Sequence, residues 1–249
     1  MRIAIKFAYD GRNLHGYARQ PNLTTVEGEL IKSLVKHGFI HDAKTSLFRS
    51  ASRTDKGVSA LGNVASFNTN ISKNQILETL SDIHPSIIVY GKKEVKSDFN
   101  PRHAKQRKYR YYLPTDNLDV EKIASTLPHF IGKHNFSNFA RLESFKDPIR
   151  TIDSIETSLE NNRLIIDFSA QTFLWHQIRR IISALIKVGN GKIERGQLID
   201  ALGVPDKKVD YGLAPAEPLI LMDIVYDFNF GCDENSFSKI DSLKEKLKG

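Results

Sequence analysis

Cysteine is almost missing from this chain of 249 residues, because Cys232 is the only one. A single thiol excludes a disulfide framework within one chain and a zinc site built from several cysteines. His37 and His41 are four residues apart, but no nearby cysteine or acidic pattern completes a metal motif. We therefore expect no metal, and a cytoplasmic protein.

Long apolar runs are missing as well. No stretch approaches the roughly 20 apolar residues that cross a bilayer. Residues 1–7 alternate as a strand does and do not resemble the apolar core of a signal peptide. The sequence predicts a protein that is neither secreted nor membrane-spanning.

Acidic residues are fewer than basic ones, 29 against 36, which leaves a formal net charge of +7. A basic surplus favours a polyanionic partner, most commonly nucleic acid. Hydrophobic residues make up 40% and charged residues 26%, which is typical of a folded chain. The length allows one large domain or two of medium size.

Strands and helices alternate along the chain. Thr24 and Glu27 form a capping box before a helix that ends near Gly38. The widest apolar stripe predicts a helix over 173–188. Further strands are expected at 3–7, 47–49, 63–67, 87–95, 107–113, 151–159, 164–170 and 219–228, and further helices at 72–80, 119–127 and 194–202. This alternation predicts a sheet covered by helices on one face, with a seam near residue 100.

The stretch from Ser50 to Ala60 contains the candidate catalytic residue. Asp55 lies in a Thr-Asp-x-Gly turn, in which Gly57 can take a positive φ. Arg53 and Lys56 flank the carboxylate and favour its ionised form, which suits a nucleophile or a base and a phosphate-bearing partner. The alternative interpretation is an ordinary turn whose charges face water.

Two further clusters bear on chemistry. Between residues 102 and 112, basic residues alternate with tyrosines, so that cations can contact phosphates while rings stack on bases; a solvated strand face is the alternative. Arg179 follows the apolar face of the 173–188 helix and needs a carboxylate partner if it is buried, while Arg180 can reach solvent. Asp55 is a candidate partner for Arg179, and an intrahelical glutamate or plain solvent is the simpler one.

Five motifs, in this order, resemble the tRNA pseudouridine synthases of the TruA family, and the resemblance runs nearly end to end. They are Tyr9-Asp-Gly with Gly16–Gln20, Arg53–Val58, Phe99–Arg102 with Arg107–Tyr111, Phe173–Arg180, and Ala214–Leu219. Bacterial members often have Trp, Ala and His where this chain has Tyr17, Lys56 and Ser59. Its Thr-Asp-Lys-Gly-Val-Ser-Ala segment is similar to the archaeal and eukaryotic branch associated with positions 38 and 39 of tRNA.

The resemblance implies a role for several residues. Asp55 is the expected catalytic aspartate, Arg179 its ion-pair partner, and Tyr109 the tyrosine near the target base. Arg53 is expected to help fill the gap that the flipped nucleotide leaves. The other residues expected to bind substrate are Arg102, Lys105 and Leu219.

The resemblance also implies an α+β fold of two ferredoxin-like halves that share an extended antiparallel sheet, with helices on one face and a basic cleft. The expected halves are 1–100, which carries the aspartate loop, and 101–249, which carries the tyrosine strand and the arginine helix. The implied substrate is tRNA, modified within the anticodon stem-loop at positions 38 to 40. A homodimer is implied, in which one tRNA contacts both subunits, and no cofactor is required.

Two other classes of function stay open at this point. A non-catalytic RNA-binding protein needs the basic and aromatic strand but not Asp55. A glycosidase could use Asp10 and Asp55 as its pair of carboxylates. The first predicts RNA binding without a change in the uridine, and the second predicts sugar cleavage with no preference for tRNA.

Overall fold

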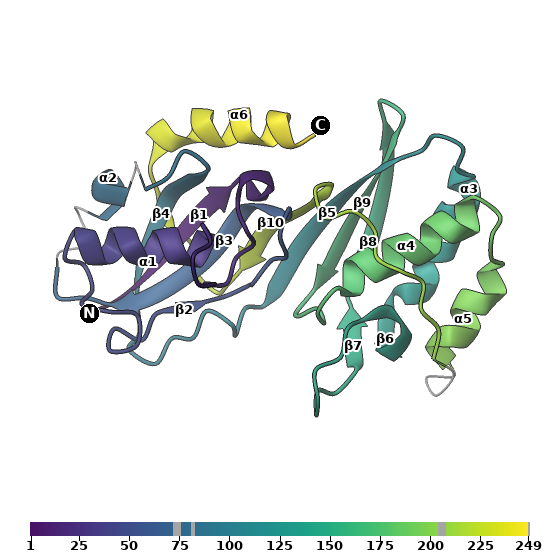
Figure 1. Ribbon diagram of the computed structural model, residues 1–249, viewed down its shortest axis with the longest axis horizontal. Helices are drawn as coiled ribbons and strands as arrows, with labels where there is room; N and C mark the ends of the chain where they lie inside the picture. The colour runs from purple at the N-terminus through teal and green to yellow at the C-terminus, as the bar shows by residue number, and fades with distance from the viewer. Residues whose placement is uncertain (72–75, 81–82, 204–207, 249) are drawn as a thin grey trace. The chain divides into compact units, whose positions relative to one another are not determined.

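The computed structural model describes residues 1–71, 76–80, 83–203 and 208–248. The chain forms two compact units: unit 1 comprises Met1–Lys105 and Ala216–Gly249, and unit 2 comprises Gln106–Pro215. Figure 1 shows the yellow C-terminal elements beside the purple and blue strands of unit 1. The division expected from the sequence, 1–100 and 101–249, differs from these units mainly in the C-terminal segment, which packs with unit 1.

Unit 1 is built around one sheet. Its strands are β1 (Arg2–Tyr9), β2 (Arg49–Ser50), β3 (Ser59–Asn68), β4 (Ile87–Val95), β10 (Leu219–Val225) and β11 (Gly231–Cys232). Its helices are α1 (Val26–Lys36), α2 (Ile76–Thr79) and α6 (Phe237–Leu247), with 3-10 turns η1 (Gly11–Asn13) and η6 (Glu234–Ser236). The strand order is β11-β4-β1-β3-β10, and β2 also pairs with β3. The first four strands and two helices follow the βαββαβ order of a ferredoxin-like unit.

Strand β1 lies in the core of unit 1. Ile3, Ile5 and Phe7 are fully buried, but Ala4 and Ala8 on the other face are fully buried as well. The strand that the alternation predicted to be half-buried is therefore buried on both faces. Helix α1 begins one residue later than the capping box predicted, because Thr25 rather than Thr24 accepts the N–H of Gly28. The second predicted helix starts outside the described residues, and its described part is α2.

One strand pair departs from the antiparallel expectation. Strand β10 runs parallel to β3, with Ile220 opposite Ser59 and Leu221 opposite Ala60. Parallel neighbours need a long crossover connection, and here all of unit 2 lies between the two strands in the sequence. The pairing therefore returns the C-terminal segment to unit 1, next to the start of β3.

Unit 2 has two sheets. Its strands are β5 (Gln106–Pro114), β6 (Gly132–Asn135), β7 (Ile149–Ile152), β8 (Ser154–Glu160) and β9 (Arg163–Ala170). Its helices are α3 (Val120–Thr126), α4 (Gln177–Gly189) and α5 (Arg195–Gly203), with 3-10 turns η4 (Leu127–Phe130) and η5 (Ser137–Phe139). Antiparallel strands β5, β9 and β8 lie in that order, and β6 pairs with β7. Asn161 and Asn162 join β8 to β9 with positive φ angles, as a tight hairpin turn requires. The strand expected over 151–159 is divided between β7 and β8.

Helix α4 is shorter than predicted. The apolar stripe predicts a helix from Phe173, whereas α4 begins at Gln177. His176 has a φ of +63°, in the left-handed region, and this conformation breaks the helical path before Gln177. Residues 173–176 therefore form a loop that leads into the helix.

The described chain is thus a mixed α+β protein with a many-stranded sheet, as the sequence predicted. Among the described residues, every helix is too short or too polar to cross a membrane.

Candidate functional site

Asp55 lies on the loop of residues 51–58 that connects β2 to β3 in unit 1. Its side chain is half-buried, whereas Arg53 and Lys56 are exposed. The N–H of Val58 donates to the Asp55 carbonyl at 3.2 Å, and Gly57 takes a φ of +89°, which confirms the predicted turn. A Cβ on Gly57 would lie 3.0 Å from Oε1 of Glu217 and 3.1 Å from Cβ of Ala216, which is a tight fit, and the positive φ itself favours glycine at this position.

Three buried residues hold this loop, two through its backbone and Tyr9 through the side chain of Thr54. The N–H of Tyr17 donates to the Thr54 carbonyl at 3.1 Å, and the Tyr9 hydroxyl is 2.8 Å from Oγ1 of Thr54. Nδ2 of Asn63 donates to the carbonyl of Ser52 at 3.0 Å. The side chains of Tyr9, Tyr17 and Asn63 are fully buried, so the loop is fixed by hydrogen bonds that water does not contest.

Gly16 and Tyr17 bring the first motif against the Asp55 loop. Gly16 has a φ of +86°, and a Cβ there would lie 3.2 Å from the backbone nitrogen of Lys56. The Tyr17 hydroxyl donates to Oγ of Ser50 at 2.6 Å, and burial raises the pKa of that phenol well above its ordinary value. Tyr17 is therefore a neutral structural donor and not part of an exposed aromatic surface.

The sequence analysis missed Asn63 as a residue that supports the site. The available signal was an amide side chain between the apolar residues Leu61 and Val64 of β3. A buried polar side chain must find hydrogen-bond partners, but the sequence does not show that Ser52 and Tyr9 supply them.

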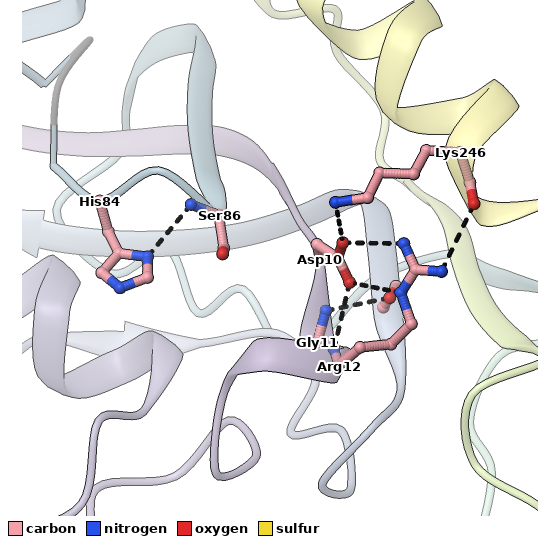
Figure 2. Close-up of polar contacts among 7 residues, drawn as sticks. Asp10, Gly11, Arg12, His84, Ser86 and Lys246 are labelled. Atoms are coloured by element: carbon pink, nitrogen blue, oxygen red, sulfur yellow. Dashed lines mark hydrogen bonds and ion pairs between the residues drawn. The ribbon is translucent and has the colours of Figure 1, made fainter.

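Asp10 forms the charged anchor of the first motif (Figure 2). Its carboxylate accepts bonds from Nε and Nη2 of Arg12, both at 2.9 Å, and lies 3.0 Å from Nζ of Lys246 on α6. The hydrogen bond from Arg12, together with Lys246, holds the pKa of Asp10 well below its ordinary value despite burial. This carboxylate is fully engaged by cations, which argues against its use with Asp55 as a glycosidase pair.

Gly11, next to Asp10, contacts the end of the Asp55 loop. Its N–H donates to Oγ of Ser59 at 3.0 Å. A Cβ on Gly11 would lie only 2.0 Å from the Val58 carbonyl oxygen, a clash that no substitution avoids. The backbone N–H of Asp10 also donates to the Ser86 carbonyl at 3.0 Å, and this bond ties the motif to the start of β4. The first motif thus clamps the end of the loop where Val58 enters β3.

The other predicted substrate-binding residues of unit 1 have different environments. Arg102 is exposed, on a turn in which its N–H donates to Oδ1 of Asn100 at 3.2 Å. Lys105 forms an exposed ion pair with Asp227. Leu219 begins β10 and is only 6% exposed. Contact between these residues and a substrate stays a prediction.

In unit 2, Tyr109 lies half-buried on β5. Its ring packs edge-on against Phe173, with the ring centroids 5.4 Å apart. Of the basic residues beside it, Arg107 is buried and bonds the Gln171 carbonyl, whereas Arg110 forms a bidentate pair with Asp167 at 2.7 and 2.8 Å. Two of the cations predicted to face phosphates therefore have structural roles.

Arg179 and Arg180 lie in the first turn of α4 and have different partners. Nε of Arg179 donates to the Ala214 carbonyl at 2.8 Å, and the Ala214 N–H donates back to the Arg179 carbonyl at 3.2 Å. Arg180 extends to Asp210 at 2.9 Å. The Gly212 N–H and the charge of Arg180 lower the pKa of Asp210. Since Asp55 belongs to unit 1 and Arg179 to unit 2, their ion pair stays a prediction.

The described residues contain no group of three or more His, Cys, Asp or Glu side chains that could hold a metal ion.

Comparison with known proteins agrees with the motifs. The family model described as tRNA pseudouridine synthase matches residues 127–227. A tRNA pseudouridine synthase A of Thermococcus sibiricus is 44% identical, over 96% of this chain and 91% of that protein. Proteins of the same name from Pyrococcus abyssi (40% identical, over 100% of this chain and 96% of that protein) and Methanothermobacter thermautotrophicus (39% identical, over 98% and 89%) match as fully. A chain in the solved structure of a Cbf5-Nop10-Gar1 complex aligns with a TM-score of 0.39 at 12% identity, over 74% of this chain and 45% of that one, which is too low to add to the argument. With identities of this size over nearly the whole chain, the protein belongs to the tRNA pseudouridine synthase A (TruA) family, isomerases that act on tRNA.

Proposed function

We propose that the protein isomerises uridine to pseudouridine in the anticodon stem-loop of tRNA, at positions 38 to 40, with 38 and 39 as the main targets. The observation that carries the proposal is the Asp55 loop, whose carboxylate is half-exposed on a backbone fixed by Tyr9, Tyr17 and Asn63. A catalytic group fixed before substrate arrives needs little reorganisation in the reaction. The Thr-Asp-Lys-Gly-Val-Ser-Ala segment supports positions 38 and 39.

The reaction breaks the bond from C1′ to N1 of uracil, turns the base within the pocket, and forms a bond from C1′ to C5. Asp55 is assigned to the sugar, either attacking C1′ or removing the 2′ hydrogen, and a base then takes the C5 proton. An isotope effect of primary size with uridine deuterated at C2′ is expected for the second route and not for the first. Tyr109 is our candidate for the C5 base, and Arg179 for the partner that keeps Asp55 ionised. No cofactor enters this scheme.

Substrate binding in this proposal depends on extruding the uridine. Unstacking a base costs roughly a few kcal/mol, and contacts from a basic cleft offset that cost. Exposed Arg53, two residues before Asp55, is assigned to the gap that the uridine leaves. Arg102 and Lys105 are assigned to phosphates, and Leu219 completes the substrate-binding set.

We further propose a cytoplasmic homodimer in which one tRNA contacts both subunits. Light scattering coupled to size-exclusion chromatography measures the mass with and without tRNA. A monomer at working concentration, with full activity, would refute the dimer without affecting the proposed chemistry.

The decisive experiment incubates unmodified tRNA with the wild type and with Asp55→Asn, followed by carbodiimide mapping of pseudouridine. We expect modification at positions 38 and 39 by the wild type. Asp55→Asn, nearly isosteric but without the anionic carboxylate, should give no product and retain tRNA affinity within about twofold. Substantial isomerisation by this variant, with deamidation excluded by mass spectrometry, would contradict the assignment. RNA binding by the wild type without any product would favour a non-catalytic RNA-binding protein instead.

A further inference from the structure

Trp175 is the only tryptophan of the chain and lies on the surface of unit 2, in the loop before α4. It is 42% exposed, whereas Leu174 and Gln177 beside it are buried. A large aromatic side chain contributes most to stability when it is buried, so an exposed one fixed in place suggests a binding role. The sequence analysis placed this residue inside the predicted helix and gave it no role.

The loop holds the indole outward. His176, with a φ of +63°, has a left-handed backbone between Trp175 and the helix. Such a conformation costs about 1 kcal/mol or more in a residue other than glycine. Oε1 of the buried Gln177 accepts the N–H of Leu174 at 2.8 Å and so fixes the loop from inside. The backbone that carries Trp175 is therefore held in place.

Arg141 lies over the indole. Its guanidinium carbon is 4.2 Å from the ring centroid, and its backbone N–H donates to the Trp175 carbonyl at 2.8 Å. Within the described part of the chain, Arg141 forms no ion pair, and the acids of neighbouring segments pair elsewhere: Glu143 with Lys146, and Asp210 with Arg180. The pair thus presents an exposed aromatic ring together with a planar cation whose charge is not neutralised.

An unpaired nucleotide fits these features. Single-stranded RNA is recognised by stacking its bases on aromatic rings and on arginine planes, while cations attract its phosphates. A base inside a duplex cannot offer its face to the indole. The net charge of +7 also favours a polyanion over an acidic or neutral protein surface.

We propose that Trp175 and Arg141 form a platform for one unpaired nucleotide of the RNA substrate, different from the target uridine. The exposed indole stacks on the base, and Arg141 contacts the adjacent phosphate. The inference rests on the proposed function, because it assumes an RNA with a loop as substrate. Tyr109, which is assigned to the target base, contacts the ring of Phe173. Phe173 lies two residues before Trp175 in the same loop of unit 2, so the loop that carries the platform also contacts Tyr109.

The single tryptophan gives a direct assay. Asp55→Asn protein is titrated with unmodified tRNA and, in parallel, with a fully paired RNA duplex of similar length, while tryptophan emission is recorded. Since all tryptophan emission comes from residue 175, we expect strong quenching by tRNA and little by the duplex. Arg141→Ala should leave the protein folded by circular dichroism, weaken tRNA binding about tenfold and reduce the quenching.

Affinity and turnover of variants complete the test. In the otherwise wild-type enzyme, Trp175→Ala should raise KM about tenfold with little change in kcat, and Trp175→Phe should restore most of the loss. Phe237→Ala is the matched control, because Phe237 is 44% exposed but none of the described cations lies over its ring. It should leave KM unchanged.

Several outcomes would overturn the proposal. Emission that stays unchanged at saturating tRNA would show that the indole does not meet the RNA. Equal quenching by the duplex would indicate that Trp175 contacts double-stranded RNA. A change in the mass of the Trp175→Ala assembly, without a change in KM, would indicate that Trp175 lies at an interface between copies of the protein. Complete loss of tRNA binding by Asp55→Asn itself would count against the proposed function, and is distinguishable from a defect confined to the Trp175 and Arg141 variants.

Discussion

Replacing Asp10 with asparagine tests whether the anchor of the first motif supports the Asp55 loop. The Asp10 side chain is 3% exposed, while those of Arg12 and Lys246 are 31% and 62% exposed. Breaking a buried ion pair costs about 3–5 kcal/mol, and an exposed pair contributes at most about 1 kcal/mol. Since Asp10 is buried and its partners are not, we expect a loss of about 2 kcal/mol in the free energy of unfolding. For a chain of this size that corresponds to a decrease in Tm of roughly 4–8 °C.

The dependence on pH separates the charge of Asp10 from its shape. Arg12 and Lys246 hold the pKa of the folded carboxyl below its ordinary value of 3.8. The ionised form therefore favours folding: its contribution is present above about pH 4 and is lost as the pH falls through the folded-state pKa. Urea unfolding should give a constant difference between wild type and Asp10→Asn from about pH 7 to 5, and a narrowing difference below about pH 4. A difference independent of pH down to about pH 2 would refute the charge argument.

Activity shows whether the anchor also aligns the site. Gly11 and Gly16 approach the backbone of Val58 and Lys56 closely, so a shift of the first motif moves the Asp55 loop. We expect Asp10→Asn to lower kcat roughly tenfold with tRNA affinity retained, because small displacements of a catalytic group are costly. Asp42→Asn is the control. Hydrogen bonds from Thr45 are the main cause of the lowered pKa of Asp42, but these bonds lie within its own turn and do not reach the Asp55 loop. Wild-type kcat in Asp10→Asn, or equal losses in both variants, would contradict the alignment.

The remaining predictions concern Arg179 and the binding of RNA. Arg179→Ala should lower both kcat and Tm, because it removes the bond to Ala214 and the proposed partner of Asp55. Arg179→Lys should recover Tm more than kcat. A crystal structure in which ordered Asp55 and Arg179 side chains are more than one water apart would reject the proposed ion pair between them. Binding of tRNA should weaken steeply with salt, with log affinity falling by several units per unit of log salt. Arg102→Glu and Lys105→Glu should each flatten this slope, whereas Tyr109→Phe should lower turnover and spare affinity. A slope near zero would show that phosphate contacts do not drive binding.

Local signals in the sequence predicted most elements and missed the long-range pairings. Alternation in residues 3–7 is enough to predict β1, and the Asn pair after β8 is enough to predict a hairpin. The parallel partner of β3 lies more than 150 residues further along the chain, and nothing near Ser59 or Ile220 indicates it. The membership of the C-terminal segment in unit 1 follows from that pairing and could not be predicted.

The candidate site shows the same division. The turn around Asp55 was predictable because Thr-Asp-x-Gly determines it locally, with Gly57 at positive φ. Its supports were not, because the bonds of Tyr9 and Asn63 depend on which strands become neighbours. Helix α4 was predicted too long for a related reason. The apolar residues of 173–176 fit a helical stripe, but the left-handed backbone of His176 prevents the helix from starting before Gln177. Hydrophobic periodicity carries no information about φ, so the sequence did not show this.

Counting basic residues in the sequence also overestimates the charge available to RNA. Arg12, Arg110 and Lys105 each pair with a carboxylate, Asp10, Asp167 and Asp227 respectively. By contrast, Arg53, Lys56 and Lys108 are exposed and form no ion pair within the described residues. A neutralised cation releases little counterion when it meets a phosphate, because its carboxylate must first be displaced. The salt dependence should therefore follow the second set. Two of its three members, Arg53 and Lys56, flank Asp55, so cations free to contact phosphate lie next to the carboxylate proposed to act on the sugar.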